Sequence, residues 1–308
     1  MTTATPLPAP GPARGGALMG VSVTASMVGV HVGSVAGGVV TVVAVLVAVV
    51  LLSGGRSWRT TDLPAWSTVT MGVLALGSAA DSTLGFTTVH LVTWLVGTVA
   101  AVVVFVPQTL ALVRGRLPRT FPAALPLVTP MVAATNAAQL GHPLPGTLCF
   151  VASLLTGVPA LCLVYLTAGR HPEPPAAATA WIPLGIVGQS ATAALLLAGC
   201  TVYAGAVLAL GVPAALWALR VHWGTLLRTP PATSLATYGP AWWSCTFPVG
   251  TCSLGTHHLS LATGAAWLDG VSAVLLALLV LHVALATAGL AGQLYVTSTG
   301  EWSLQRRS

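Results

Sequence analysis

The chain carries very little charge for its length. Its 308 residues include 11 basic and five acidic side chains, so only 5% of them are charged, and every basic side chain is an arginine. A soluble domain carries about 25% charged residues. Hydrophobic residues make up 55% of the chain, and the mean hydropathy is +0.89. This composition excludes the soluble classes and indicates an all-α polytopic membrane protein.

Other absences narrow the function. The five cysteines form no paired framework, which excludes a small disulfide-stabilised scaffold. No nucleic-acid-binding motif accompanies the scattered arginines, so we expect no nucleic-acid partner. The adjacent His257 and His258 would point about 100° apart on a helix and chelate poorly together, and Cys245 and Cys252 are typical of small buried fillers. The sequence therefore predicts no metal site, no cofactor and no enzymatic activity.

The arginines divide the chain into five apolar blocks. The first four have 41 to 51 residues and the fifth has 72. Because a helix that crosses a bilayer needs about 20 apolar residues, each block predicts two crossings joined by a turn. The blocks are 15–55, 63–113, 120–169, 175–219 and 229–300. The turns are expected at Gly37–Gly38, Asp81, His142–Pro145, Gly199–Cys200 and Asp269.

This division places all the arginines on one side of the membrane. Positive residues concentrate on the cytoplasmic side, so we predict ten transmembrane helices as five helical hairpins, with N and C termini cytoplasmic. We expect a disordered proline-rich N-terminal tail at 1–16, a ten-helix transport domain at 17–296 and a short cytoplasmic C-terminal tail at 297–308. Arginine without lysine, beside abundant alanine and valine, is typical of a GC-rich bacterial genome and points to a bacterial plasma membrane.

The first helix of each predicted pair differs in composition from the second. Second members are mainly valine, alanine and leucine, as in 39–52, whereas first members carry prolines, glycines and polar side chains. Proline inside a span is tolerated beside a watery cavity, but small residues also serve close packing of helices. A polar path between the first members and simple packing therefore both remain open. The candidate pore-lining residues are Thr129, Pro130, Gly185, Gly188, Gln189, Ser190, Thr246, Pro248 and Gly250.

No aspartate, glutamate or arginine lies near the middle of any predicted span, and the chain contains no lysine. Proton relays and cation sites in transporters normally rest on intramembrane carboxylates, so their absence argues against a carboxylate-coupled pump and a cation pore. A neutral path with arginines at its cytoplasmic mouth suits small inorganic or carboxylate anions.

One segment carries a family resemblance. Residues 242–251, Trp-Trp-Ser-Cys-Thr-Phe-Pro-Val-Gly-Thr, resemble the ninth-helix signature of the tellurite-resistance/dicarboxylate transporter family. This family includes plant slow anion channels, bacterial tellurite-resistance proteins and fungal malate and sulfite transporters. Residues 181–190 are similar to its seventh-helix stretch, and 18–21 and 125–132 give weaker matches. One departure is Ile186, which stands where many members have a proline.

The resemblance implies a fold and a gate. Members of the family have ten helices arranged as five hairpins around a central pore, with the odd helices inside, often as a homotrimer in the lipid bilayer. A phenylalanine of the ninth helix can plug the pore, and the matching residue is Phe247. The sequence thus predicts an anion channel or transporter with a hydroxyl-lined, phenylalanine-gated pore. A proton-coupled C4-dicarboxylate (malate-like) carrier, or a sulfite or tellurite efflux protein, is the alternative.

Overall fold

The structure is a computed structural model that describes residues 10–167, 172–229 and 239–299. Within these ranges all regular structure is helical and no β-strand occurs. The α-helices are α1 (Gly15–His31), α2 (Ser34–Leu52), α3 (Leu63–Leu84), α4 (Thr87–Val113), α5 (Leu125–Gln139), α6 (Pro143–Thr167), α7 (Ile182–Ala198), α8 (Thr201–Arg228), α10 (Thr246–Thr263) and α11 (Ala266–Thr299). Short 3-10 helices are η1 (Pro12–Arg14), η2 (Gly55–Arg59), η3 (Phe121–Ala124), η4 (Pro174–Trp181) and η5 (Pro240–Cys245).

Eight of the helical segments in the described ranges are long and apolar enough to cross a membrane. The remaining two α-helices are α1, which has 17 residues, and α10, whose 18 residues include many hydroxyl side chains and two histidines. This architecture confirms the prediction of an all-α polytopic membrane protein.

Tight turns join the helices in consecutive pairs. Only two or three residues separate α1 from α2, α3 from α4, α5 from α6, α7 from α8, and α10 from α11. Each of these turns contains a glycine with φ between +61° and +136°, a region that other residues adopt only with strain. The five glycines are Gly33, Gly85, Gly141, Gly199 and Gly264. Glycine in the left-handed conformation is the common way to end a helix and reverse the chain.

Three of the predicted turn positions are wrong. Gly37–Gly38 lie inside α2, Asp81 lies inside α3 and Asp269 lies in the first turn of α11. Gly37 serves a different purpose, because a Cβ atom added there would lie 2.7 Å from the Cα atom of Gly29 on α1. Gly37–Gly38 therefore mark a place where α2 packs closely on its neighbours. The turn between α1 and α2 lies at Gly33, four residues earlier in the sequence.

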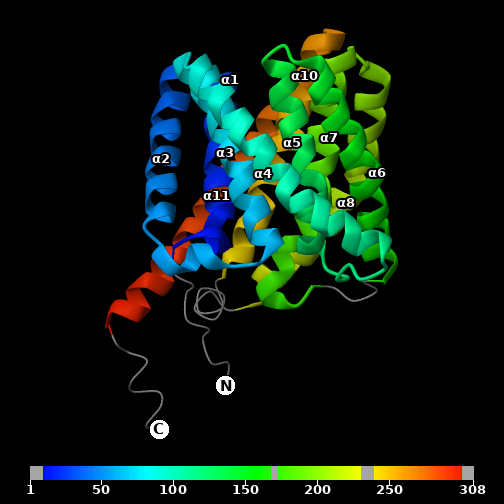
Figure 1. The fold of residues 1–308 in the computed structure, drawn as a ribbon. Coiled ribbons are helices and arrows are strands. Elements are labelled where there is room, and N and C mark those ends of the chain that lie inside the picture. Colours follow the sequence, from blue (N-terminus) through cyan, green and yellow to red (C-terminus); the bar gives the residue numbers. More distant parts are fainter. Residues whose placement is uncertain (1–9, 168–171, 230–238, 300–308) are drawn as a thin grey trace.

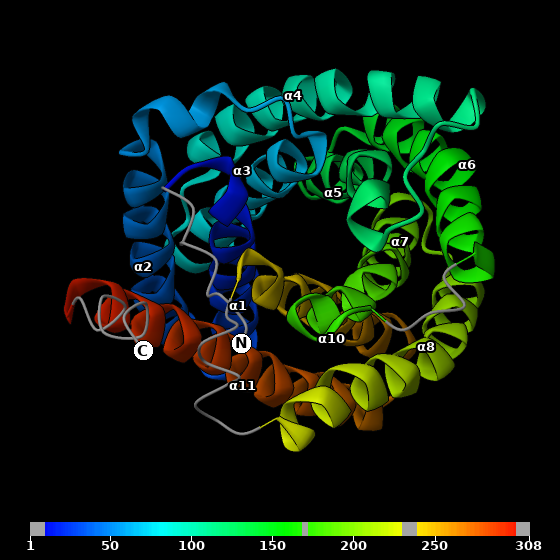
Figure 2. The same ribbon diagram turned by 90° about the horizontal axis from the view of Figure 1, so that it is seen from below.

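The helices form two concentric rings, which Figure 1 shows from the side and Figure 2 along the axis. The inner ring is closed, because α1 contacts α3, α3 contacts α5, α5 contacts α7, α7 contacts α10, and α10 returns to α1. Its members are the first helices of the five pairs. In the apolar segments that contain α5 and α7, 83% and 78% of the residues are buried. In the segment of α8 only 17% of the residues are buried. The second members of the pairs therefore form the outer ring.

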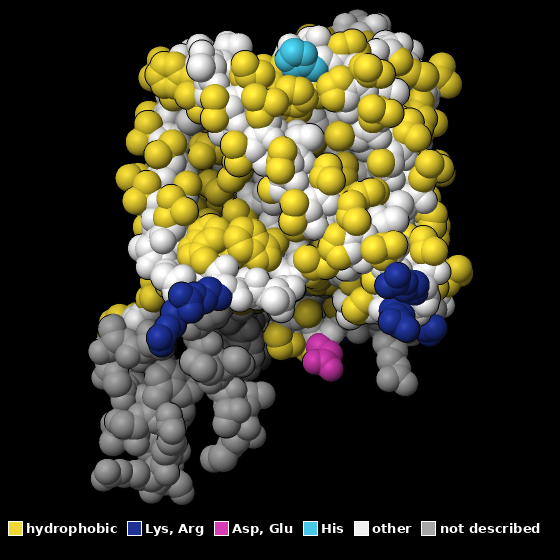
Figure 3. Space-filling model, viewed as in Figure 1, with side chains coloured by type: hydrophobic (Ala, Val, Ile, Leu, Met, Phe, Trp, Pro, Cys, Tyr) yellow, Lys and Arg dark blue, Asp and Glu magenta, His cyan; other side chains and the backbone are white. Residues whose placement is uncertain are grey.

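Arginine side chains gather at one end of the molecule. In Figure 3 they lie along the lower edge, below a broad band of hydrophobic side chains. Arg56 and Arg59 follow α2, while Arg114, Arg116 and Arg119 lie between α4 and α5, and all five are exposed. The five glycine turns lie at the opposite end of the helices.

Part of the predicted tails lies outside the described residues. This holds for 1–9 of the N-terminal tail, for 300–308 of the C-terminal tail and for three of the arginines, Arg170, Arg306 and Arg307. The domain boundaries predicted from the sequence therefore stay predictions.

We expect Gly188→Ala to destabilise the inner ring. A Cβ atom at this position on α7 would lie 2.3 Å from the carbonyl carbon of Thr251 on α10, so the two helices would have to separate. Overpacking of this kind costs about 1–3 kcal/mol. The measurement is the thermal unfolding midpoint of the purified protein in detergent, which should fall. Gly224→Ala on α8 is the matched control, because nothing lies within 4 Å of its added Cβ atom; equal midpoints for the two variants would contradict the prediction.

Candidate functional site

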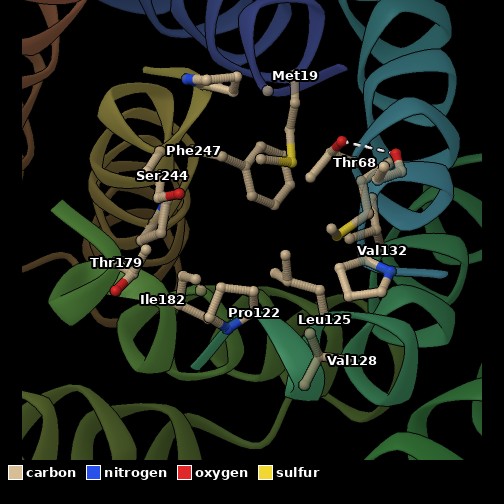
Figure 4. A pocket seen from close by; sticks show the side chains of 18 of the residues that line it. Met19, Thr68, Pro122, Leu125, Val128, Val132, Thr179, Ile182, Ser244 and Phe247 are labelled. Carbon is tan, nitrogen blue, oxygen red and sulfur yellow. Dashed lines mark hydrogen bonds between the residues drawn. The ribbon is translucent and has the colours of Figure 1, made fainter. Parts of the chain in front are cut away.

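A cavity of about 290 Å³ lies inside the inner ring, on the arginine-bearing side. Its wall comes from α1, α3, α5, α7 and α10 and from the 3-10 helices η3, η4 and η5 that precede three of them. It reaches the surface, since its lining includes the exposed residues Ala13 and Asp62. Figure 4 shows the side chains that surround it. All inner helices thus contribute to one central space.

Phe247 faces this cavity from the first turn of α10. Its side chain is only 4% exposed, and in Figure 4 its ring projects into the cavity beside the sulfur of Met19. A close crossing of α1 and α10 sets this position, because a Cβ atom on Gly20 would lie 2.2 Å from Thr246 Oγ1. Gly16, one turn earlier, meets Trp243 in the same way, at 2.9 Å from its Cβ atom. Two glycines of α1 therefore bring Met19 and Phe247 together.

Most of the cavity wall is apolar. Next to Phe247 and Met19 it includes Met71, Val128 and Val132. The hydroxyl groups of Thr68 and Thr179 donate hydrogen bonds to backbone carbonyls of their own helices, Ala65 O at 2.8 Å and Ala176 O at 2.7 Å. Local bonds of this kind satisfy a hydroxyl inside a membrane helix. The wall consequently offers few polar groups to an ion, and each of these groups matters for the binding of an ion.

Gln189 on α7 is the amide side chain of the cavity wall. It is 5% exposed, and its Oε1 accepts a hydrogen bond of 2.7 Å from Thr135 Oγ1 on α5. This bond connects two inner helices. It also sets the orientation of the amide group, with the oxygen toward Thr135 and the NH2 group away from it. The NH2 group is then the part of Gln189 that can donate to an anion.

A second polar contact lies one residue farther along α5. His90 of α4 is buried between two oxygen atoms, with Nδ1 3.0 Å from Asp81 Oδ2 and Nε2 2.8 Å from Asn136 Oδ1. Asn136 Nδ2 donates to Val132 O at 2.8 Å, so its Oδ1 is the acceptor. The ring of His90 therefore bridges an oxygen atom of Asp81 on α3 and an oxygen atom of Asn136 on α5. Asp81, His90 and Asn136 together link α3, α4 and α5 at the end opposite the arginines.

The residues predicted from the sequence divide into two groups. Four of them line the cavity, namely Phe247, Gly185, Gln189 and Pro248. The other six lie outside its lining: Thr129, Pro130, Gly188, Ser190, Thr246 and Gly250. Ile186, the departure from the family pattern, also lies outside it, and a Cβ atom on Gly157 of α6 would lie 3.1 Å from its Cδ1 atom. The helix α7 runs without a break through Ile186.

The six residues outside the lining serve the packing of the inner ring. Thr129 and Thr246 donate to carbonyls of the chain just before them, Leu125 O and Trp243 O, both at 2.8 Å, and Ser190 does so to Val187 O at 3.3 Å. Pro130 is buried within α5. Gly188 faces α10, and Gly250 faces Val23 and Leu279 on α1 and α11. Close packing therefore accounts for these six residues, whereas a polar path between the inner helices stays a prediction.

Sequence reasoning did not select several residues of the cavity wall. Met19, Thr68 and Thr179 are examples, since no motif distinguishes a lone methionine or threonine in an apolar helix. The spacing of Gly16 and Gly20 on α1 was the available signal. Glycines four residues apart mark the face where a neighbouring helix approaches closely, and Met19 lies next to that face.

Comparison with known proteins supplies a family. A sequence profile described as voltage-dependent anion channel matches residues 56–291, which is more than half of the chain. No curated protein sequence matches the chain at a significant level. The match includes Trp242 to Thr251, which carried the resemblance, and members of the family are channels or transporters. The chain therefore belongs to the voltage-dependent anion channel family, the tellurite-resistance/dicarboxylate transporter family that its ninth-helix segment resembles.

Proposed function

We propose that the protein conducts small anions passively through the inner ring and that Phe247 is the gate. In this proposal all ten helices cross a bacterial plasma membrane as five hairpins, both termini lie in the cytoplasm, and three chains assemble. The observation that carries the proposal is the position of Phe247. The ring of this residue projects into a cavity that is open on the arginine-bearing side, in a chain of an anion-transporting family.

The charge distribution supports an anionic substrate. Exposed arginines surround the end of the molecule at which the cavity opens. A positive rim raises the local concentration of anions and lowers that of cations. Asp62 is the acidic residue of the cavity lining, and it is exposed at the rim.

The chemistry of the side chains around Phe247 supports gating by an apolar plug. Phe247, Met19 and Val132 give an ion no replacement for its hydration shell. A hydrophobic constriction of this kind closes a pore by excluding water. In this proposal a displacement of the phenylalanine ring admits the hydrated anion.

We expect Phe247→Ala to raise anion conductance about tenfold or more, because removal of the ring opens the constriction. Planar-bilayer recording of the purified variant, with chloride and nitrate on both sides, measures the effect. Phe86→Ala is the matched control, since Phe86 is exposed in the turn between α3 and α4. Currents no larger than those of the wild type, from a variant with an unchanged gel-filtration profile, would exclude the gate.

We expect Gln189→Glu to reduce anion flux several-fold more than Gln189→Met does. A carboxylate in an apolar wall repels the permeating anion, whereas methionine only removes the amide donor. Chloride efflux from vesicles that contain equal amounts of each variant gives the comparison. Equal flux in both variants would show that Gln189 does not face the permeating ion.

We expect flux to follow the membrane potential and to be independent of a proton gradient. The cavity wall includes one carboxylate, Asp62 at the exposed rim, and the polar side chains within are neutral, so nothing there couples an anion to a proton. The measurement is anion flux into vesicles at a fixed potassium diffusion potential, with and without a protonophore. A loss of flux when the proton gradient alone is collapsed would favour the proton-coupled dicarboxylate carrier instead.

A further inference from the structure

Three potential metal ligands meet at the end of the molecule opposite the arginines. They are His31, the last residue of α1, His257 of α10 and Asp269 in the first turn of α11. One ring nitrogen or carboxylate oxygen from each lies within 4.8 Å of the others. The two imidazole rings meet edge to face, with centroids 5.6 Å apart. Residues that are far apart in the sequence thus converge on one point.

Hydrogen bonds decide which nitrogen of His257 carries the proton. Its Nδ1 lies 2.7 Å from Asp269 Oδ1. An ionised carboxylate only accepts hydrogen bonds, so Nδ1 is the donor and Nε2 keeps its lone pair. A carboxylate behind a histidine in this way is the arrangement that orients metal-binding imidazoles and makes them more basic.

The same reasoning applies to His31. Its Nε2 lies 2.9 Å from Ser272 Oγ. The hydroxyl of Ser272 donates its only proton to Ser253 O at 2.8 Å, and Ser253 Oγ donates in return to Ser272 O at 2.8 Å. Ser272 Oγ therefore accepts from His31 Nε2, which leaves the lone pair on Nδ1. Both histidines of the cluster keep one nitrogen free to coordinate.

A second cluster shows the opposite pattern. Potential ligand atoms of His222, Cys245 and His282 also lie within 4.8 Å of one another, and all three residues are buried. Here the indole N–H groups of Trp181 and Trp223 donate to His222 Nδ1 and His282 Nε2, both at 3.1 Å. An indole N–H only donates, so the remaining nitrogen of each neutral imidazole carries the proton and has no lone pair for a metal. This cluster therefore does not offer two imidazole lone pairs to one metal ion.

We propose that His31 and His257 bind a divalent transition-metal ion of the Zn²⁺ class, with Asp269 as the carboxylate that orients His257 and balances the charge. Imidazole nitrogen suits zinc, copper and nickel, whereas Mg²⁺ and Ca²⁺ prefer oxygen ligands. The His257 and Asp269 side chains are 17% and 48% exposed, so an ion can reach them from solution, and water can complete its coordination. The bound ion would connect α1, α10 and α11 at the ends remote from the cavity.

The test uses the full chain, purified in detergent through a tag without histidine and stripped with a chelator. Isothermal titration with ZnCl₂ should show one ion per chain. His31→Gln and His257→Gln should each weaken binding by more than about tenfold, and Asp269→Asn by about 10–100-fold. His142→Gln, an exposed histidine in the turn between α5 and α6, should bind as the wild type does.

Electron paramagnetic resonance of bound Cu²⁺ gives a readout that needs no variant. The wild-type spectrum should show coupling to two imidazole nitrogens, and each histidine variant should lose one of them. The proposal is overturned if folded wild-type protein binds no Zn²⁺, if its Cu²⁺ spectrum lacks nitrogen coupling, or if both histidine variants bind with unchanged affinity. All these measurements are made without transport, so they are independent of the proposed channel activity.

Discussion

Close approach of helix backbones is the constraint on which this architecture depends. Five helices can enclose a narrow space only if neighbours pack with little between them, and glycine permits that at Gly20 and Gly188, where an added Cβ atom would meet the next helix at 2.2 and 2.3 Å. In lipid there is little hydrophobic force between helices, so this packing itself supplies much of the association energy. The crossing at Gly20 also sets the position of Phe247, so the gate that we propose would be a consequence of how the inner ring is closed.

Satisfaction of polar groups inside the chain is the second constraint. Bonds of hydroxyls to carbonyls three or four residues back account for most threonines and serines of the inner helices, including Thr129 and Thr246. A hydroxyl that is satisfied in this way offers less to a passing ion, so abundance of such residues does not by itself create a polar path. The bond from Thr135 to Gln189 differs because it joins two helices and fixes the amide at the cavity wall.

The sequence predicted the fold better than it predicted the site, for physical reasons. Spacing of arginines and length of apolar blocks are long-range signals, and they correctly indicated an all-α polytopic membrane protein. Turn positions failed where glycine had two possible uses, as at Gly37, which packs on α1 and does not reverse the chain. Phe247 was recognisable because a motif surrounds it, whereas Met19 became a wall residue only through the crossing of α1 and α10. Contacts between distant segments carry no local signature.

Hydrogen-bond partners determine the chemistry of a histidine cluster more than its composition does. In the sequence the neighbour of His257 is His258, and these two side chains would chelate a metal poorly. In the fold the ring of His257 meets the ring of His31, which belongs to another helix. That cluster and the one around His282 have similar spacing, but an oxygen acceptor behind an imidazole frees the opposite lone pair and an indole donor removes it. Two groups of ligand-type residues in one membrane protein can therefore have opposite properties, and the difference lies in the residues immediately behind them.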